Sequence, residues 1–103
     1  MSLQRREELI RIARRFDALV VADDVYDFLQ WETQHGALSM PSKACLPRLV
    51  DVDRYLDGGT ECSYSHHFGN AVSNGSFSKI VGPGCRTGWV EGTSAFIEAL
   101  CHR

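Results

Sequence analysis

The chain has 103 residues, of which 44% are hydrophobic and 23% are charged, and its formal net charge is −2. This length fits one small domain or part of a larger one, and the composition is that of a globular protein rather than a disordered or fibrous one. The slightly acidic balance argues against binding to nucleic acid, which needs a surplus of basic side chains on one face.

The lack of a recognisable targeting signal and the spacing of the cysteines favour a protein inside the cell. No apolar run approaches the roughly 20 residues that cross a bilayer, so no membrane association is expected. The opening MSLQRREELI lacks the apolar core of a secretory signal, which favours a cytoplasmic protein, although so abrupt a start also fits a truncated N-terminus. None of the four cysteines belongs to a CxxC pair, which favours reduced thiols: Cys45, Cys62, Cys85 and Cys101. Cys62 lies near His66 and His67, but no second pair has the spacing of a zinc site, and no metal is expected.

The first predicted element is an amphipathic helix over residues 3–16. Its apolar positions recur at helical spacing, opposite a row of arginines: Leu9, Ile12, Ala13 and Phe16. A short apolar run over residues 17–24 follows and ends in Asp23 and Asp24. Because it lacks alternation, it predicts a strand buried on both faces of an α/β sheet. Ligands of such sheets bind beyond the carboxyl ends of strands, where these two acids stand.

The middle of the chain carries weaker signals. Residues 25–31 fit a short helical turn, and residues 32–69 read as a long excursion in which 49–56 are partly ordered. A connection of that length is unusual inside a compact domain. We therefore expect this stretch to pack against parts of a protein that lie beyond the chain.

The last third predicts a strand, a loop, a strand and a helix. The strands cover residues 71–77 and 87–92, and the loop 78–86 turns through Gly-Pro-Gly between them. We expect these two strands to pair antiparallel. Thr93 or Ser94 can cap a closing helix that runs through Leu100. So few elements make a poor independent core, which predicts either self-association or a slice of something larger.

The loop between these strands concentrates groups that suit a phosphorylated aldehyde. Lys79 supplies an amine that can condense with a carbonyl group. Serine hydroxyls and a guanidinium match a phosphate dianion, and the Gly-Pro-Gly turn brings the guanidinium back beside the lysine. The candidate phosphate-binding side chains fall within residues 76–86: Ser76, Ser78 and Arg86.

A second set of groups follows the first predicted strand. A pyridine ring works as an electron sink only when its nitrogen stays protonated, and an adjacent carboxylate holds that proton. Asp23 offers such a carboxylate, and Tyr26, three residues later, offers a hydrogen-bond donor for the other side of the same ring. We expect Asp24 to have a structural role in the turn.

Together these motifs resemble a known family. The string ADDVYDFL at 22–29, SFSK at 76–79 and PGCR at 83–86 are similar to fold-type-I, class I/II aminotransferases, which use pyridoxal 5'-phosphate (PLP). The branch that they resemble most is that of the aminoadipate and kynurenine aminotransferases. The order of helix and strand before Asp23 also matches, so that the likeness covers most of the chain.

The resemblance assigns a role to each matching residue. Lys79 would be the catalytic residue that forms the Schiff base with PLP and later shuttles a proton. Asp23 would pair with the pyridine nitrogen, and Tyr26 would bond the ring hydroxyl oxygen. The phosphate would be held by three residues: Ser76, Ser78 and Arg86. The parent reaction would move an amino group from an amino acid to a 2-oxo acid, in a homodimer.

The resemblance also implies a fold and an incomplete site. Residues 1–103 would be the central part of the large PLP-binding domain, a three-layer α/β/α unit whose mostly parallel sheet has one antiparallel strand. A glycine-rich turn, a ring-stacking aromatic, an asparagine and the substrate-carboxylate arginine of the family have no counterpart here, so the chain alone is expected to be inactive. Three alternatives stay open: a PLP-dependent lyase or synthase, an effector domain of a transcriptional regulator, and a degenerate fragment that binds nothing.

Overall fold

The computed structural model describes residues 1–27, 29, 47–59 and 67–102. It contains α-helices and a mixed three-stranded β-sheet, which confirms the predicted α/β class. In chain order the helices and strands are α1 (Leu3–Arg15), β1 (Val20–Asp23), α2 (Leu49–Tyr55), β2 (Ala71–Ser76), β3 (Gly88–Glu91) and α3 (Ser94–Cys101). Three 3-10 turns complete the set: η1 (Leu56–Gly58), η2 (Phe77–Lys79) and η3 (Pro83–Cys85).

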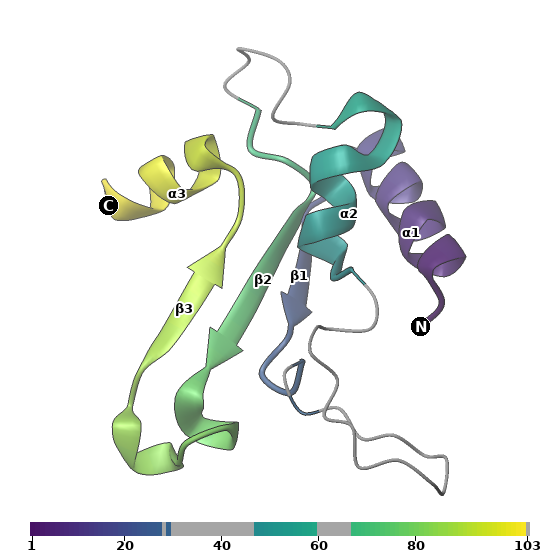
Figure 1. The fold of residues 1–103 in the computed structure, drawn as a ribbon. Coiled ribbons are helices and arrows are strands. Elements are labelled where there is room, and N and C mark those ends of the chain that lie inside the picture. Colours follow the sequence, from purple (N-terminus) through teal and green to yellow (C-terminus); the bar gives the residue numbers. More distant parts are fainter. Residues whose placement is uncertain (28, 30–46, 60–66, 103) are drawn as a thin grey trace, which may run out of the picture.

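The strands form one mixed sheet in the order β1-β2-β3 (Figure 1). β1 and β2 are parallel, with Val20 opposite Ala71 and Asp23 opposite Asn74. β2 and β3 are antiparallel, as expected for strands joined by a short loop, and Ser76 lies opposite Gly88. The carboxyl ends of β1 and β2 therefore meet the start of β3 at one end of the sheet, the lower end in Figure 1.

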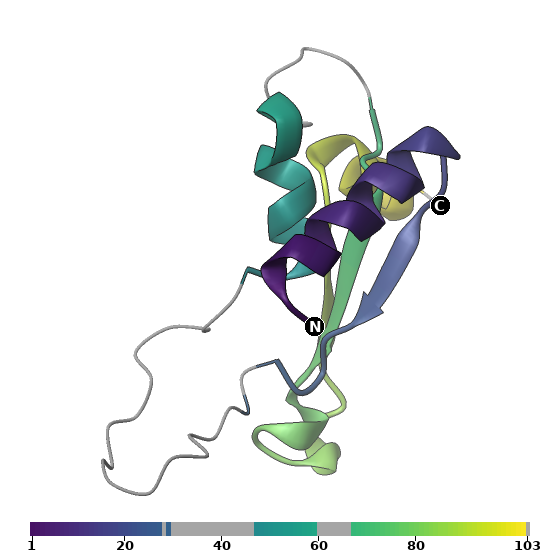
Figure 2. The ribbon, with the colours of Figure 1, turned by 90° about the vertical axis from the view of Figure 1, so that its right-hand side faces the viewer.

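Helices α1 and α2 lie side by side and pack against the same part of the sheet (Figures 1 and 2). Their shared core is small: Ile10, Val52, Leu56 and Ala71, each at most 6% exposed. Ser2 caps the N-terminus of α1, because its hydroxyl accepts a hydrogen bond from the Arg5 amide. The predicted helix over 3–16 is thus confirmed, and the ordered part expected at 49–56 is α2 with the start of η1.

A buried carboxylate joins α1, α2 and the start of β2. Asp53 is 2% exposed. One oxygen accepts hydrogen bonds from the amides of Asn70 and Ala71, at 2.6 and 3.2 Å, and the other pairs with Arg14 Nη2 at 3.1 Å. A carboxylate removed from water is tolerated only when its oxygens are satisfied in this way. Asp53 therefore fixes where β2 begins relative to both helices.

The prediction that the first strand is buried on both faces is wrong. β1 is shorter than residues 17–24, and Val21 on it is 66% exposed, as are two apolar residues of α1, Ile12 (55%) and Phe16 (70%). β1 is an edge strand, and no element in the described part of the chain covers its outer face. Apolar runs predict burial from sequence, but burial needs a second layer to pack against.

The C-terminal part follows the predicted order closely. β2 and β3 each lie within the predicted ranges, and Thr93, rather than Ser94, caps α3 by accepting a hydrogen bond from the Phe96 amide at 3.3 Å. α3 lies apart from α1 and α2 (Figure 1).

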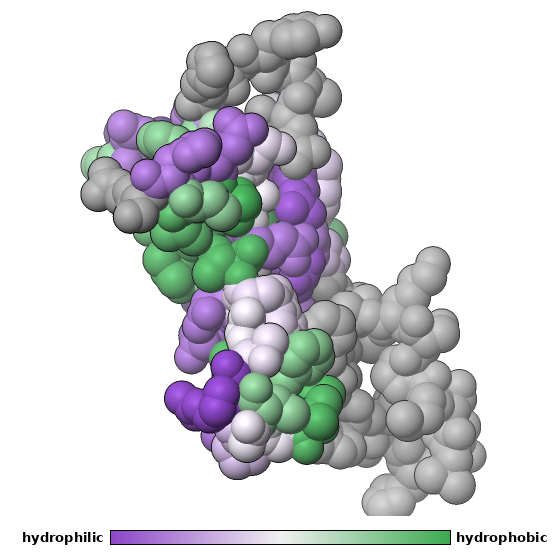
Figure 3. All heavy atoms as spheres, turned by 90° about the vertical axis from the view of Figure 1, so that its left-hand side faces the viewer, coloured by the Kyte–Doolittle hydropathy of each residue, from purple (hydrophilic) through white to green (hydrophobic). Residues whose placement is uncertain are grey.

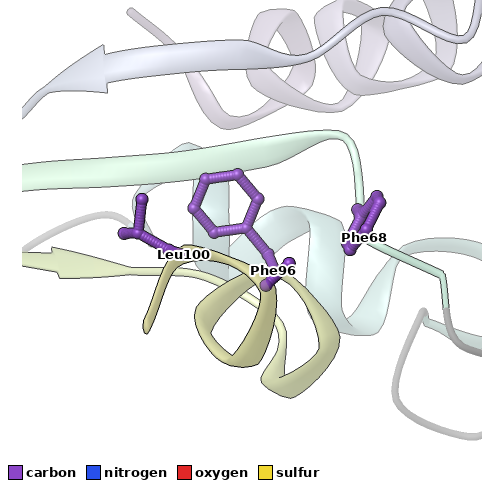
Figure 4. A pocket seen from close by; sticks show the side chains of 4 residues that line it. Phe68, Phe96 and Leu100 are labelled. Atoms are coloured by element: carbon purple, nitrogen blue, oxygen red, sulfur yellow. The ribbon is translucent and has the colours of Figure 1, made fainter. Parts of the chain in front are cut away.

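Apolar side chains gather on the face of the molecule that Figure 3 shows, and an open hollow of about 360 Å³ lies there (Figure 4). It is lined by Phe68, Phe96, Ala99 and Leu100.

Some sequence predictions lie outside the described residues. Most of the excursion over 32–69 and the end of the turn over 25–31 belong to this group, as do Cys45, Cys62 and His66.

Cys85 and Cys101 are exposed free thiols. Among the described residues, no cluster of three or more His, Cys, Asp or Glu is placed to hold a metal ion. None of the described helices has the length and apolar character needed to cross a membrane.

Candidate functional site

The two acids after β1 have different surroundings. The Asp24 amide donates to the Asn74 carbonyl at 2.9 Å, which extends the parallel pairing by one residue. Its carboxylate accepts a hydrogen bond of 2.6 Å from the hydroxyl of Ser73, a fully buried residue. Asp23 is exposed and accepts a hydrogen bond of 3.2 Å from the Asn74 side chain. Asp24 is therefore held in the structure, whereas Asp23 presents its carboxylate to solvent at the strand end.

Tyr26 and Lys79 meet at the same end of the sheet, although they lie far apart in the sequence. The Lys79 Nζ atom stands 5.7 Å from the centroid of the Tyr26 ring. An ammonium over an aromatic face at this range is attracted by about 0.5–1 kcal/mol when the site is exposed, and the Tyr26 side chain is 57% exposed. The fold thus brings together the residue groups after β1 and after β2.

Hydrogen bonds of the loop fix the position of Lys79. The Ser76 hydroxyl accepts a hydrogen bond from the Ser78 amide at 3.1 Å and so caps η2, the turn that carries Lys79. The Phe77 carbonyl accepts from the amides of Ile80, Val81 and Gly82, at 2.9 to 3.1 Å. Because one carbonyl collects three amides, the chain reverses tightly directly after Lys79. The lysine therefore projects from a defined turn rather than from an open loop.

Arg86 closes the same loop in a strained conformation. Its φ and ψ are 47° and 33°, in the left-handed region that a side chain other than glycine adopts at a cost of roughly 1 kcal/mol or more. Next to it, the Thr87 carbonyl accepts a hydrogen bond of 3.1 Å from the Phe77 amide, which ties the end of the loop to its beginning. Arg86 is exposed, and its guanidinium makes no ion pair with any other described residue. Strained backbone of this kind is common at ligand sites.

An arginine that the sequence analysis did not single out lies behind the turn after β1. Arg48, at the start of α2, reaches the carboxylates of Asp27, Asp51 and Glu91, with nitrogen–oxygen distances of 3.7, 3.1 and 2.8 Å. Burial raises the pKa of Asp27 above its ordinary value of 3.8, and the Asp24 carboxylate raises it further, against the opposing effect of Arg48. Asp27 and Glu91 are too far from Arg48 in the sequence for any local pattern to reveal these contacts, whereas Asp51 lies only three residues away.

The predicted site residues therefore fall on neighbouring segments. Asp23 and Tyr26 follow β1, and the others lie in the loop between β2 and β3: Ser76, Ser78, Lys79 and Arg86. An amine, a phenol, hydroxyls, a guanidinium and a carboxylate at one end of a sheet suit an anionic compound that carries a carbonyl group.

Several known proteins are similar to nearly the whole of this chain. An uncharacterized protein of Saccharomyces cerevisiae is 43% identical over 91% of this chain and 19% of its own length. An aromatic amino acid aminotransferase of Schizosaccharomyces pombe is 34% identical over 97% of this chain and 20% of its own length. An uncharacterized HTH-type transcriptional regulator of Bacillus subtilis is 33% identical over 97% of this chain and 16% of its own length.

The similarity extends along nearly the whole chain but not along the relatives. The chain spans about a fifth of the length of the proteins that it matches. It is thus similar to one segment of aminotransferases. No protein-family model matches it, and no solved structure matches it.

Proposed function

We propose that residues 1–103 are the central part of the large domain of a PLP-dependent aminotransferase of fold type I, class I/II. The observation that carries this is the approach of Lys79 to Tyr26 across two strand ends, in a segment similar to aminotransferases. In the whole protein, the sheet of β1, β2 and β3 would belong to a mostly parallel sheet with one antiparallel strand, covered by helices on both faces. That second layer would cover the apolar residues now exposed on β1.

The residues present fit the cofactor. Lys79 provides the amine for the PLP aldehyde, and the reversal after η2 holds that amine at the strand end. The Tyr26 phenol would bond the ring oxygen beside the aldehyde, and the exposed Asp23 carboxylate would keep the pyridine nitrogen protonated. Three groups would bind the phosphate: the hydroxyls of Ser76 and Ser78 and the guanidinium of Arg86. When bound, PLP supplies the electron sink that stabilises charge on the substrate carbon.

The substrates of the whole protein would be an amino acid and a 2-oxo acid. Aromatic amino acids are the leading candidates because relatives bear the name aromatic amino acid aminotransferase. Lys79 would move the proton between substrate and cofactor carbons. In a homodimer, the segments absent from this chain would contribute the remaining contacts with cofactor and substrate, and so the chain alone should bind PLP weakly and catalyse no transfer.

A second candidate is the effector domain of a transcriptional regulator. The specific observation is the similarity to the Bacillus subtilis protein named an HTH-type regulator. Both candidates share the cofactor site, because the Lys79 loop and the Asp23 turn serve to bind PLP whichever chemistry follows. A DNA-binding segment in the same polypeptide would favour the regulator, and amino transfer by that polypeptide would favour the enzyme. A lyase or synthase would use the same residues.

The cofactor site is tested with the chain's two lysines, Lys43 and Lys79. Added PLP is expected to give at most a weak Schiff-base absorbance with the wild-type chain. Lys79→Ala should abolish this band, whereas the matched variant Lys43→Ala should retain it. An equal band from Lys79→Ala would show that the amine assignment is mistaken.

A further inference from the structure

The Arg48 guanidinium connects three segments that lead to the candidate site. Its Nη1 donates to Glu91 of β3 at 2.8 Å, and its Nε and Nη2 donate to the two oxygens of Asp51 in α2, each at 3.1 Å. Its Nε also lies 3.7 Å from an oxygen of Asp27, next to Tyr26 in the chain. The planar fork of an arginine suits such a junction, since its several donors point in fixed directions.

The Asp27 side of this junction is largely shielded from water. The side chains of Arg48 and Asp27 are 16% and 17% exposed. Charges screened this little interact more strongly than exposed ion pairs, whose typical contribution is small. Burial disfavours the charged form of Asp27, and the positive charge of Arg48 opposes this effect. A charged Asp27 is therefore more stable beside Arg48 than away from it.

The Asp27 carboxylate stands in the turn that orients Tyr26. The Asp27 amide donates to the Asp24 carbonyl at 3.0 Å, and the Leu29 amide donates to the Tyr26 carbonyl at 2.9 Å. The turn has hydrogen bonds at both of its ends, and within it Tyr26 immediately precedes the residue that Arg48 holds. Restraint of Asp27 therefore restrains the backbone from which the Tyr26 ring projects.

We propose that Arg48 is a positioning residue of the candidate site. By holding Asp27 against α2 and β3, it sets where the Tyr26 ring stands beneath the Lys79 amine. The value of that placement for cofactor binding rests on the proposed function, but the placement itself does not. In this role Arg48 would act through Asp27 rather than by contact with the cofactor or the substrate.

The test measures the Tyr26–Lys79 contact without any cofactor. The Lys79 Nζ atom stands 5.7 Å from the centroid of the Tyr26 ring, so the ring current should shift the NMR signals of the protons on the adjacent Cε atom upfield. Asp27→Asn leaves the bonds of Arg48 to Asp51 and Glu91 in place and should lose most of this shift, with an unchanged circular dichroism spectrum. The matched control is Asp57→Asn, which changes another ion-paired aspartate, 3.5 Å from Arg11, and should keep the full shift.

Arg48→Lys provides a second arm, since it keeps the positive charge but loses the fork, and it should also lose most of the shift. A full upfield shift in folded Asp27→Asn and Arg48→Lys would overturn the proposal. So would a wild-type chain without the shift, because there would be no contact to position. If the shift behaves as expected but PLP gives no Schiff base with any variant, the positioning role stands and the proposed function fails.

Discussion

At the scale of the residue, Gly75 packs closely against the Trp89 side chain beside the candidate site. A Cβ atom added there would lie 2.2 Å from the Trp89 indole, which faces Gly75 across the β2–β3 pair and stands 5.0 Å from the Phe77 ring. The indole therefore occupies the space that any larger residue would need. Directly after Gly75 comes the Ser76–Lys79 turn, so that this contact supports the backbone of the site.

We predict that Gly75→Ala destabilises the chain by about 1–3 kcal/mol, because a close-packed site must shift to admit the methyl group. Gly84→Ala is the matched control, since a Cβ there would meet nothing within 4 Å. Urea unfolding followed by tryptophan fluorescence measures both. Equal stabilities of the two variants would contradict the packing described around Trp89.

Sequence patterns identified the candidate site residues that belong to motifs. They did not identify the residues that hold those site residues in position. The acid, the tyrosine, the lysine and the arginine stand out because motifs place them at fixed offsets after strands. Arg48 joins Asp27 to Glu91, and no offset in the sequence relates such partners. The contact between Lys79 and Tyr26 likewise depends on the pairing of β1 with β2, which the sequence made plausible only by analogy.

At the scale of the element, ion pairs connect the beginning and the body of α2 to β3. Glu91 of β3 accepts hydrogen bonds from Arg48 at 2.8 Å and from Arg54 at 3.0 Å. These bonds lower the pKa of Glu91 below its ordinary value of 4.5, and the bond from Arg48 has the largest effect. Partial burial of Glu91 acts in the opposite direction. A carboxyl whose pKa is lower in the folded state stabilises the fold above its unfolded-state pKa and loses that effect as the pH falls through the folded-state pKa.

Glu91→Gln should therefore reduce the free energy of unfolding at pH 7 by about 1–2 kcal/mol, discounted because the side chain remains partly hydrated. Below pH 4.5 the wild type should lose this advantage progressively, so that the two unfolding curves converge. Denaturant titrations across that range measure the difference, with Glu8→Gln on the exposed side of α1 as a control that should change little. A pH-independent difference would mean that the Arg48 and Arg54 bonds do not stabilise charged Glu91.

The elements themselves were largely predictable, whereas their burial was not. Helical periodicity located α1, and turn residues delimited β2 and β3 to within one or two residues. β1 carried the apolar run of a strand covered on both sides, yet Val21 on it is exposed. Periodicity reports which face a residue is on, but only the neighbouring layers decide whether that face is covered.

At the scale of the whole molecule, a small core and uncovered apolar residues fit a segment of a larger domain. Ile10, Val52 and Leu56 form most of the shared core, while Phe16 and Val21 face solvent. Relatives about five times as long contain the additional chain that such surfaces would need. Under the proposed function, this segment would supply residues that bind the cofactor, and the additional chain would supply those that stack on its ring or bind the substrate.

Reductive trapping tests most directly whether Lys79 is the amine that meets the cofactor. The chain is incubated with PLP, reduced with borohydride and digested, and the adduct on each lysine is quantified by mass spectrometry. We predict that Lys79 carries most of the adduct and that inorganic phosphate lowers its labelling without affecting Lys43, because the proposed phosphate-binding residues Ser76, Ser78 and Arg86 belong to the same loop as Lys79. Labelling of Lys43 equal to that of Lys79, with no effect of phosphate on either, would contradict the proposed site.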